Sequence, residues 1–144
     1  MDKIIVFTDG ASRGNPGPAA IGIVICDAQG RAQKDYAAAI GETTNNEAEY
    51  QAVIFALKKI KALVGKAKIK SAEVLIKSDS ELMVSQLSGE YKIKEPRIQN
   101  LFIQIWNLKI DYKKVDFALI HREQNTAADK LANQALDAAS QKLF

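Results

Sequence analysis

The order of the periodic segments is the strongest constraint on the fold of this 144-residue chain. Three runs, at residues 3–8, 20–26 and about 31–40, have the composition of short β-strands and precede any helical pattern. The segment Asp27–Gly30 (DAQG) between the second and third runs is typical of a hairpin connection. We therefore expect the first three strands to form an antiparallel meander.

A long helix follows the meander, and strands alternate with helices from there on. Apolar residues at helical spacing predict a helix over residues 46–64, with N-cap candidates at Thr43–Asn46. The later pattern predicts a strand at 73–77, a short helix at 79–87, a loop at 89–96, a helix at 97–109, a strand at 115–120 and a helix at 125–139. This order predicts an α/β fold with a mixed sheet and helices on both faces.

Composition excludes several classes of protein. The chain has one cysteine and one histidine, so it can form neither an internal disulfide nor a Cys/His zinc cluster. Cys26 ends an apolar run, and we expect it to be buried and unreactive. No segment resembles a signal peptide or a membrane span, which favours a cytoplasmic protein. The net charge of +3 permits a polyanionic partner, and the six lysines between residues 58 and 70 are either a solvated surface or phosphate contacts.

Two acidic residues, Asp9 and Asp79, directly follow predicted strands. The unbroken apolar run Ile4–Phe7 before Asp9 predicts a central strand that is buried on both faces. Active sites of sheets with parallel strands assemble at the carboxyl ends of those strands. Each acid alone is explained equally well by a turn or a helix cap, so Asp9 can be a turn residue, a working carboxylate, or both.

Helical geometry selects two further carboxylates. At about 100° per residue, Glu49 lies about 60° from the centre of its helix's apolar face, and Glu47 about 100° away on the other side. We therefore expect Glu49 to lean toward the sheet and Glu47 to stay solvated at the helix N-terminus. The same construction favours Asp129 over Asp137 in the last helix.

Four converging carboxylates would repel one another unless a cation binds between them. Ligands that offer only oxygen suit hard divalent cations such as Mg²⁺ or Mn²⁺. Two such ions about 4 Å apart can clamp the attacking and leaving oxygens of a phosphoryl displacement. Four unrelated surface acids are the alternative interpretation of this spacing.

Four blocks of sequence, read together, resemble the type 1 ribonuclease H family. They are FTDGASRGNPGPAAIG, TTNNEAEYQA, IKSDSELMVSQL and HREQNTAADKLAN, in this order, and the resemblance spans residues 3 to about 137. It implies the ribonuclease H-like fold, with a five-stranded mixed sheet in the order 3-2-1-4-5, strand 2 antiparallel, flanked by helices. It also implies a single catalytic domain over residues 1–144, with no separate hybrid-binding domain.

The resemblance further implies hydrolysis of the RNA strand in an RNA/DNA hybrid, leaving 5′-phosphate and 3′-hydroxyl ends. Two Mg²⁺ ions, or Mn²⁺ in their place, would act in a monomer that needs no obligate protein partner. Asp9 matches the family's acid that bridges both metals, and Asp129 would complete the site of the ion that activates water. Glu49 and Asp79 would hold the ion beside the leaving 3′-oxygen.

Substrate-binding positions also follow from the resemblance. Asn15, Asn45 and Asn46 match residues that face the minor groove, where short amides can read 2′-hydroxyls without regard to sequence. Thr44 matches a residue of the family's DNA-phosphate pocket, and the small residues of segment 10–18 are expected to let the hybrid's backbone come close. Turn formation and helix capping are the alternative explanations for these polar residues.

The chain departs from many family members in the loop before the last carboxylate. Where those members have a longer, glycine-containing loop with a catalytic histidine, this chain has the compact segment IHREQN, which resembles an archaeal-type branch. Either His121 or Arg122 takes the loop role. We favour Arg122 because arginine suits phosphate contact, although His121 would titrate near the working pH.

A second departure is the missing basic handle, a helix with exposed tryptophans that grips the DNA strand in some members. The corresponding stretch is SGEYKIKEPRIQNLFIQIW, and we expect its Trp106 to lie in the core. Weaker hybrid affinity is therefore expected. The partial substitutes for the handle would be Tyr91, Lys92, Lys94 and Arg97.

Two other functions are compatible with the same fold. One is a resolvase-like or transposase-like nuclease that acts on DNA, which the 2′-hydroxyl-reading asparagines argue against. The other is a non-catalytic hybrid-binding module, in which the loss of a carboxylate would be expected, whereas all four are present.

Overall fold

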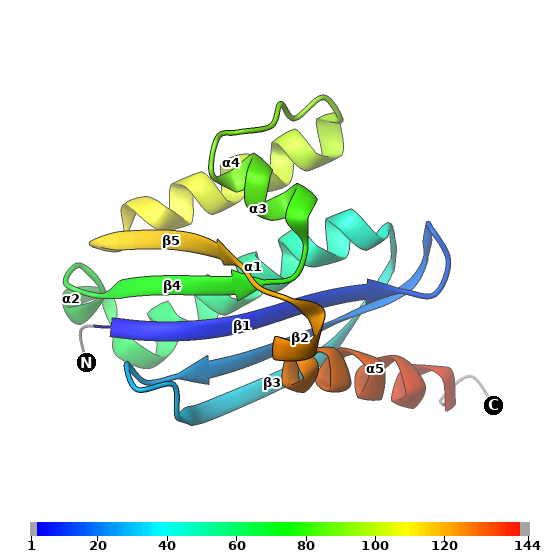
Figure 1. Cartoon of the computed structure of the whole chain (residues 1–144), viewed down its shortest axis with the longest axis horizontal. Coiled ribbons are helices and arrows are strands. Elements are labelled where there is room, and N and C mark those ends of the chain that lie inside the picture. Colours follow the sequence, from blue (N-terminus) through cyan, green and yellow to red (C-terminus); the bar gives the residue numbers. More distant parts are fainter. Residues whose placement is uncertain (1–2, 142–144) are drawn as a thin grey trace.

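The computed structural model describes residues 3–141 and shows one five-stranded sheet with helices on both faces (Figure 1). The elements in chain order are β1 (Lys3–Ser12), β2 (Gly17–Cys26), β3 (Ala32–Thr43), α1 (Asn45–Val64), α2 (Lys66–Ile69), β4 (Glu73–Ser78), α3 (Glu81–Leu87), α4 (Pro96–Ile110), β5 (Lys114–Leu119), the 3₁₀ helix η1 (Arg122–Gln124) and α5 (Thr126–Gln141).

The strand order in the sheet is β3-β2-β1-β4-β5. Strands β1, β2 and β3 pair antiparallel, whereas β4 pairs parallel with both β1 and β5. The predicted order and the predicted meander are both confirmed. Helix α1 packs on β1 and β2 with α4 beside it, and α5 packs on β1, β2 and β3 across the other face of the sheet (Figure 1).

The core lies mainly between α1 and the sheet. Ile4 and Val6 of the central strand β1 point into it and are buried, together with Tyr50, Val53 and other apolar residues of α1. Ile5 and Phe7, which alternate with them along β1, are only half-buried. The prediction of a central strand is confirmed, but burial on both faces is wrong, because α5 covers only part of the second face.

Strand β1 is longer than the sequence predicts. Gly10 and Ser12 continue the antiparallel pairing, opposite Ile21 and Ala19 of β2. The parallel pairing with β4 already ends at Phe7. Asp9 therefore lies inside a strand and not in a turn, two residues beyond the last pair between β1 and β4.

Helix α4 has a different orientation from the one that the sequence predicts. It buries Ile98 and Ile105 against the core, which turns Trp106 outward with 55% of its surface exposed. The prediction that Trp106 lies in the core is wrong, because neighbouring helix residues cannot all face one side. The short elements α2 and η1 are absent from the predicted order.

Cys26 is a buried free cysteine, as expected. Within residues 3–141, no helix has the length and apolar character that crossing a lipid bilayer requires.

Candidate active site

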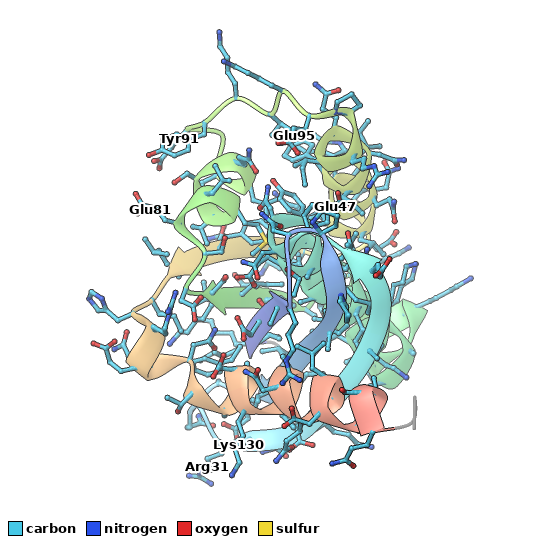
Figure 2. All side chains as sticks on the ribbon, turned by 90° about the vertical axis from the view of Figure 1, so that its right-hand side faces the viewer. Arg31, Glu47, Glu81, Tyr91, Glu95 and Lys130 are labelled. Atoms are coloured by element: carbon cyan, nitrogen blue, oxygen red, sulfur yellow. The ribbon has the colours of Figure 1, made fainter. Side chains whose placement is uncertain are left out.

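Three of the four predicted carboxylates converge at one end of the sheet. One carboxylate oxygen each from Asp9, Glu49 and Asp79 lie within 4.8 Å of one another. Asp9 comes from the middle strand, Glu49 from the first turns of α1, and Asp79 from the residue directly after β4. This is the end toward which the arrows of β1 and β4 point in Figure 1, and Figure 2 views the molecule from that side.

Gly10 brings Glu49 to the strand. A Cβ atom on Gly10 would lie 2.3 Å from the carbonyl carbon of Ala48, so only glycine lets α1 approach β1 this closely. The Gly10 N–H donates a hydrogen bond to Glu49 Oε1 at 2.8 Å. The small size of Gly10 thus fixes the position of one candidate metal ligand beside another.

Asp129 approaches the cluster from the opposite face. Gly22 of β2 pairs in register with Asp9, and a Cβ atom on Gly22 would lie 2.1 Å from the Ala128 carbonyl oxygen of α5. The close contact at Gly22 sets Asp129, the next residue of α5, on the side of Asp9. Asp129 does not belong to the cluster within 4.8 Å, and its exposed carboxylate accepts a hydrogen bond from Asn133 Nδ2 at 3.2 Å.

The electrostatics of the cluster favour proton uptake. Burial, then the charges of Asp79 and Asp129, raise the pKa of Asp9 from 3.8 to about 8, against the opposing hydrogen bond from the Gly10 N–H. Burial and the charge of Asp9 likewise raise the pKa of Glu49 well above its ordinary value. Buried carboxylates of this kind need either protons or a cation. The set offers only oxygen ligands, which fits a hard divalent cation.

Asn125 is a site residue that the sequence assigned only to the start of a helix. It is 1% exposed, and its Nδ2 donates to the Thr8 carbonyl oxygen at 2.9 Å and to Asp79 Oδ2 at 3.1 Å. The amide therefore ties the residue after β4 to the backbone of β1. No local sequence signal reveals this role, because Thr8 is 117 positions away along the chain.

The two loop candidates differ in their relation to the carboxylates. Arg122 begins the exposed helix η1, and its positive charge counteracts the raised pKa of Glu49, so the guanidinium lies within electrostatic reach of the cluster. His121 directly precedes η1, is exposed, and its backbone N–H donates to Gln124 Oε1 at 3.1 Å.

The predicted substrate-binding residues form a connected surface beside the cluster. Asn15 Oδ1 accepts the N–H of Asn45 at 2.9 Å, and Asn45 Oδ1 accepts the N–H of Ser12 at 3.3 Å. Thr44 Oγ1 accepts the N–H of Glu47 at 3.2 Å and caps α1. The side-chain oxygens thus join the β1–β2 loop to the start of α1, and the amide nitrogens of Asn15 and Asn45 take no part in these bonds.

Glu47 is not solvated, contrary to the prediction. It is 8% exposed, its carboxylate accepts a hydrogen bond from Thr43 Oγ1, and Arg97 Nη1 lies 3.7 Å from its Oε1. Figure 2 labels Glu47 at this end of the molecule. The prediction considers the helix alone, so it cannot include the contacts that Thr43 and the start of α4 make with Glu47. The neighbouring Asn46 has a buried Oδ1 without a hydrogen-bond partner among residues 3–141.

A family model described as Reverse transcriptase-like matches residues 7–135, the range that contains all four predicted carboxylates. Bifunctional protein Rv2228c of Mycobacterium tuberculosis is 38% identical over 140 residues, which cover 96% of this chain and 37% of that protein. The chain thus spans little more than a third of the length of the mycobacterial relatives that it matches.

Solved structures match over nearly the whole chain. LC11-RNase H1, crystallised in complex with an RNA/DNA hybrid, is 46% identical with a TM-score of 0.89, and the match covers 94% of this chain and 98% of that one. RNase H1 from the archaeon Halobacterium salinarum NRC-1 is 33% identical with a TM-score of 0.87, over 94% of this chain and 98% of that one.

Proposed function

Because this chain belongs to the type 1 ribonuclease H family, we propose that it is an endonuclease that hydrolyses the RNA strand of RNA/DNA hybrids. The observation that carries the proposal is the convergence of Asp9, Glu49 and Asp79, three oxygen ligands within 4.8 Å, in this fold. The products would be a 5′-phosphate and a 3′-hydroxyl. The similarity to LC11-RNase H1, which was crystallised with a hybrid, supports the choice of substrate.

The carboxylates would hold two divalent ions, Mg²⁺ or Mn²⁺. Asp9 would bridge both ions, Asp129 would complete one site, and Glu49 with Asp79 would complete the other. When bound, the ions would supply Lewis-acid chemistry to the attacking water and to the leaving 3′-oxygen. The raised pKa of Asp9, about 8, supports this assignment, because a cation would replace the proton that the cluster otherwise takes up.

Neighbouring residues would keep the carboxylates in place. Gly10 donates its N–H to Glu49, and Asn125 donates its amide to Asp79, so a hydrogen bond fixes the orientation of each acid. Such outer contacts orient metal ligands and commonly contribute about 10–100-fold to metal affinity. Arg122 is the candidate for contact with the scissile region, since its guanidinium already acts on Glu49, and His121 is the alternative.

The asparagine surface would hold the hybrid by its minor groove. The amide nitrogens of Asn15 and Asn45 take no part in the bonds that join the loop to the helix, so they can donate to 2′-hydroxyls or to base acceptors while the oxygens keep the loop and helix together. Asn46 would contribute a further amide, and the hydroxyl hydrogen of Thr44 remains available for a DNA phosphate. Hydrogen bonds to 2′-hydroxyls would favour a duplex with an RNA strand over duplex DNA, which has no 2′-hydroxyls.

We also propose a monomeric, cytoplasmic enzyme. All four carboxylates come from one chain, so the site requires no second copy. A buried, unpaired cysteine suits a reducing compartment.

Three end-labelled duplexes test this proposal: an RNA/DNA hybrid, the matched duplex DNA and the matched duplex RNA, each with Mg²⁺, Mn²⁺ or a chelator. We expect cleavage of the RNA strand of the hybrid alone, and none with the chelator. Equal cleavage of duplex DNA would instead favour a resolvase-like nuclease. Tight hybrid binding without cleavage in any metal would favour a non-catalytic module.

A further inference from the structure

A basic, partly apolar groove lies where α2, the end of α4 and the start of β5 meet. It consists of two adjoining hollows of about 440 Å³ and 420 Å³, which share Ile110 and Tyr112 in their linings. We call the two together the α4 groove. Its floor is apolar, because Ile69, Tyr112 and Val115 line it and are buried.

Lysines surround the groove. Lys61, Lys66 and Lys70 line the first hollow, and Lys109, Lys113 and Lys114 line the second. The two acidic residues of the lining are already paired, Asp111 with Lys61 at 2.7 Å and Asp116 with Lys114 at 3.2 Å. Four lysines of the rim therefore have no carboxylate partner within residues 3–141.

Two large apolar side chains stand exposed in the middle of this rim. Ile110, at the boundary of the two hollows, is 70% exposed, and Trp106, one turn earlier on α4, is 55% exposed. Lys109 Nζ lies 5.7 Å from the centre of the Trp106 ring, which keeps a positive charge beside the apolar surface. Single exposed apolar residues are ordinary, but two on one helix face between hollows form a contact surface.

The groove is remote from the candidate active site. In the parallel β4–β5 pair, Lys114 lies opposite Glu73, the first residue of β4, whereas Asp79 follows the last residue of that strand. A strand of six residues is about 20 Å long. Figure 1 shows α2 and the start of β5 at the end of the sheet opposite to the arrowheads of β1 and β4.

We propose that the α4 groove binds an acidic segment of a partner protein that carries at least one bulky apolar side chain. The unpaired lysines would pair with its carboxylates, and Trp106 and Ile110 would pack against its apolar residue. A symmetric contact with a second copy would set lysine rims against each other, which like charges oppose. A nucleic acid can stack a base on Trp106. Ile110, which is 70% exposed at the boundary of the two hollows, offers no ring face and suits a bulky apolar side chain of a peptide instead.

A random dodecapeptide library displayed on phage tests this proposal. We expect selection on the wild-type chain to enrich acidic sequences with a bulky apolar residue, and selection on Ile110→Asp not to do so. An enriched peptide, labelled with fluorescein, should bind the wild type in the micromolar range and Ile110→Asp at least tenfold more weakly, by fluorescence anisotropy. The double variant Lys109→Glu/Lys113→Glu should show a similar loss of peptide affinity. The test therefore does not depend on whether Ile110→Asp folds correctly.

Leu63→Asp is the matched control, because Leu63 is 51% exposed on α1 and lines neither hollow. This variant should bind the peptide like the wild type. Hybrid cleavage by Ile110→Asp should also equal that of the wild type, so the inference stands or fails separately from the proposed activity. No enrichment, enrichment without acidic residues, or equal binding to both groove variants would overturn the proposal. So would a groove-dependent affinity for a fluorescein-labelled DNA duplex that exceeds the peptide's.

Discussion

Asp9 and Gly22 face each other across the β1–β2 pair, and the missing side chain of Gly22 lets α5 lie directly over the sheet beside the Asp9 carboxylate. The register of one antiparallel pair thereby decides how close Asp129, on a helix more than a hundred residues further along the chain, comes to Asp9. The site is assembled by small residues as much as by acidic ones.

Replacement of Gly22 by alanine tests this relationship. The new Cβ would lie 2.1 Å from the Ala128 carbonyl oxygen, so α5 must move away from β2. We expect Gly22→Ala to lower the free energy of unfolding by about 1–3 kcal/mol and to slow hybrid cleavage. If the slowing acts through Asp129, the double variant Gly22→Ala/Asp129→Asn should cleave the hybrid about as slowly as Asp129→Asn alone. Fully additive losses would contradict that route.

Asn125 should matter for metal binding more than for substrate binding. Asn125→Ala removes the amide that holds Asp79 and leaves the buried Thr8 carbonyl without this donor. We expect a roughly tenfold rise in the Mg²⁺ concentration for half-maximal cleavage and a stability loss of about 1–3 kcal/mol. Asn100→Ala, at an exposed position of α4, is the control and should leave the Mg²⁺ titration unchanged. An unchanged titration in Asn125→Ala would refute the positioning role.

The raised pKa of Asp9 predicts how the stability of the metal-free protein depends on pH. Between 3.8 and about 8, the native Asp9 keeps a proton that the unfolded chain releases, so the free energy of unfolding falls as the pH rises through this window. Each unit of pKa shift corresponds to about 1.4 kcal/mol, so we expect Asp9→Asn to be more stable than the wild type by several kcal/mol at pH 8 in chelator, and similar to it at pH 4. Urea unfolding at both pH values measures this difference. Parallel pH profiles would contradict it.

The loop before α5 should act through Arg122. Its guanidinium lies within electrostatic reach of Glu49, so Arg122→Ala should lower the rate of hybrid cleavage by about tenfold or more, with a smaller loss in His121→Ala. Single-turnover rates of both variants decide the assignment. Arg31→Ala, an exposed arginine of the β2–β3 connection, is the control for the change in net charge. A larger loss in His121→Ala would reverse the assignment.

The hydrogen-bonded asparagines predict a change in substrate affinity. Asn45→Ala removes one amide donor from the proposed minor-groove surface and the acceptor for the Ser12 N–H. We expect KM for the hybrid to rise about fivefold with kcat nearly unchanged, because the contact is the same in the ground state and the transition state. A fall in kcat at constant KM would argue against a role in binding.

The antiparallel meander and the inward position of Glu49 were predictable because they depend on local periodicity. The strand order 3-2-1-4-5 was expected from the resemblance to the family and is confirmed, and the helical angle separates Glu49 from its neighbours. The tertiary environment decided the rest. Glu47 is buried because Thr43 and Arg97 surround it, and Asn125 joins the site through a residue at the far end of the sequence.

The end of β1 and the orientation of α4 show the same limit. A glycine after an acidic residue is typical of a turn, but Gly10 continues the strand because it still pairs with β2. Its missing side chain also allows α1 to approach closely. Trp106 has helical spacing with core residues, but Ile98 and Ile105 take the buried side of α4. Which side of a helix is buried depends on the elements that pack against it, and the spacing of its own apolar residues does not specify those elements.

The most direct test of the central claim is the single-turnover cleavage of an end-labelled RNA/DNA hybrid in Mg²⁺ by the wild type and by Asp9→Asn. Asp35→Asn, at an exposed position of β3, controls for the loss of one negative charge. The account predicts RNA-strand cleavage by the wild type and Asp35→Asn, and a rate at least a thousandfold lower, about 4 kcal/mol of barrier, in a folded Asp9→Asn. Undiminished cleavage by Asp9→Asn would contradict the assignment of Asp9 as the shared metal ligand.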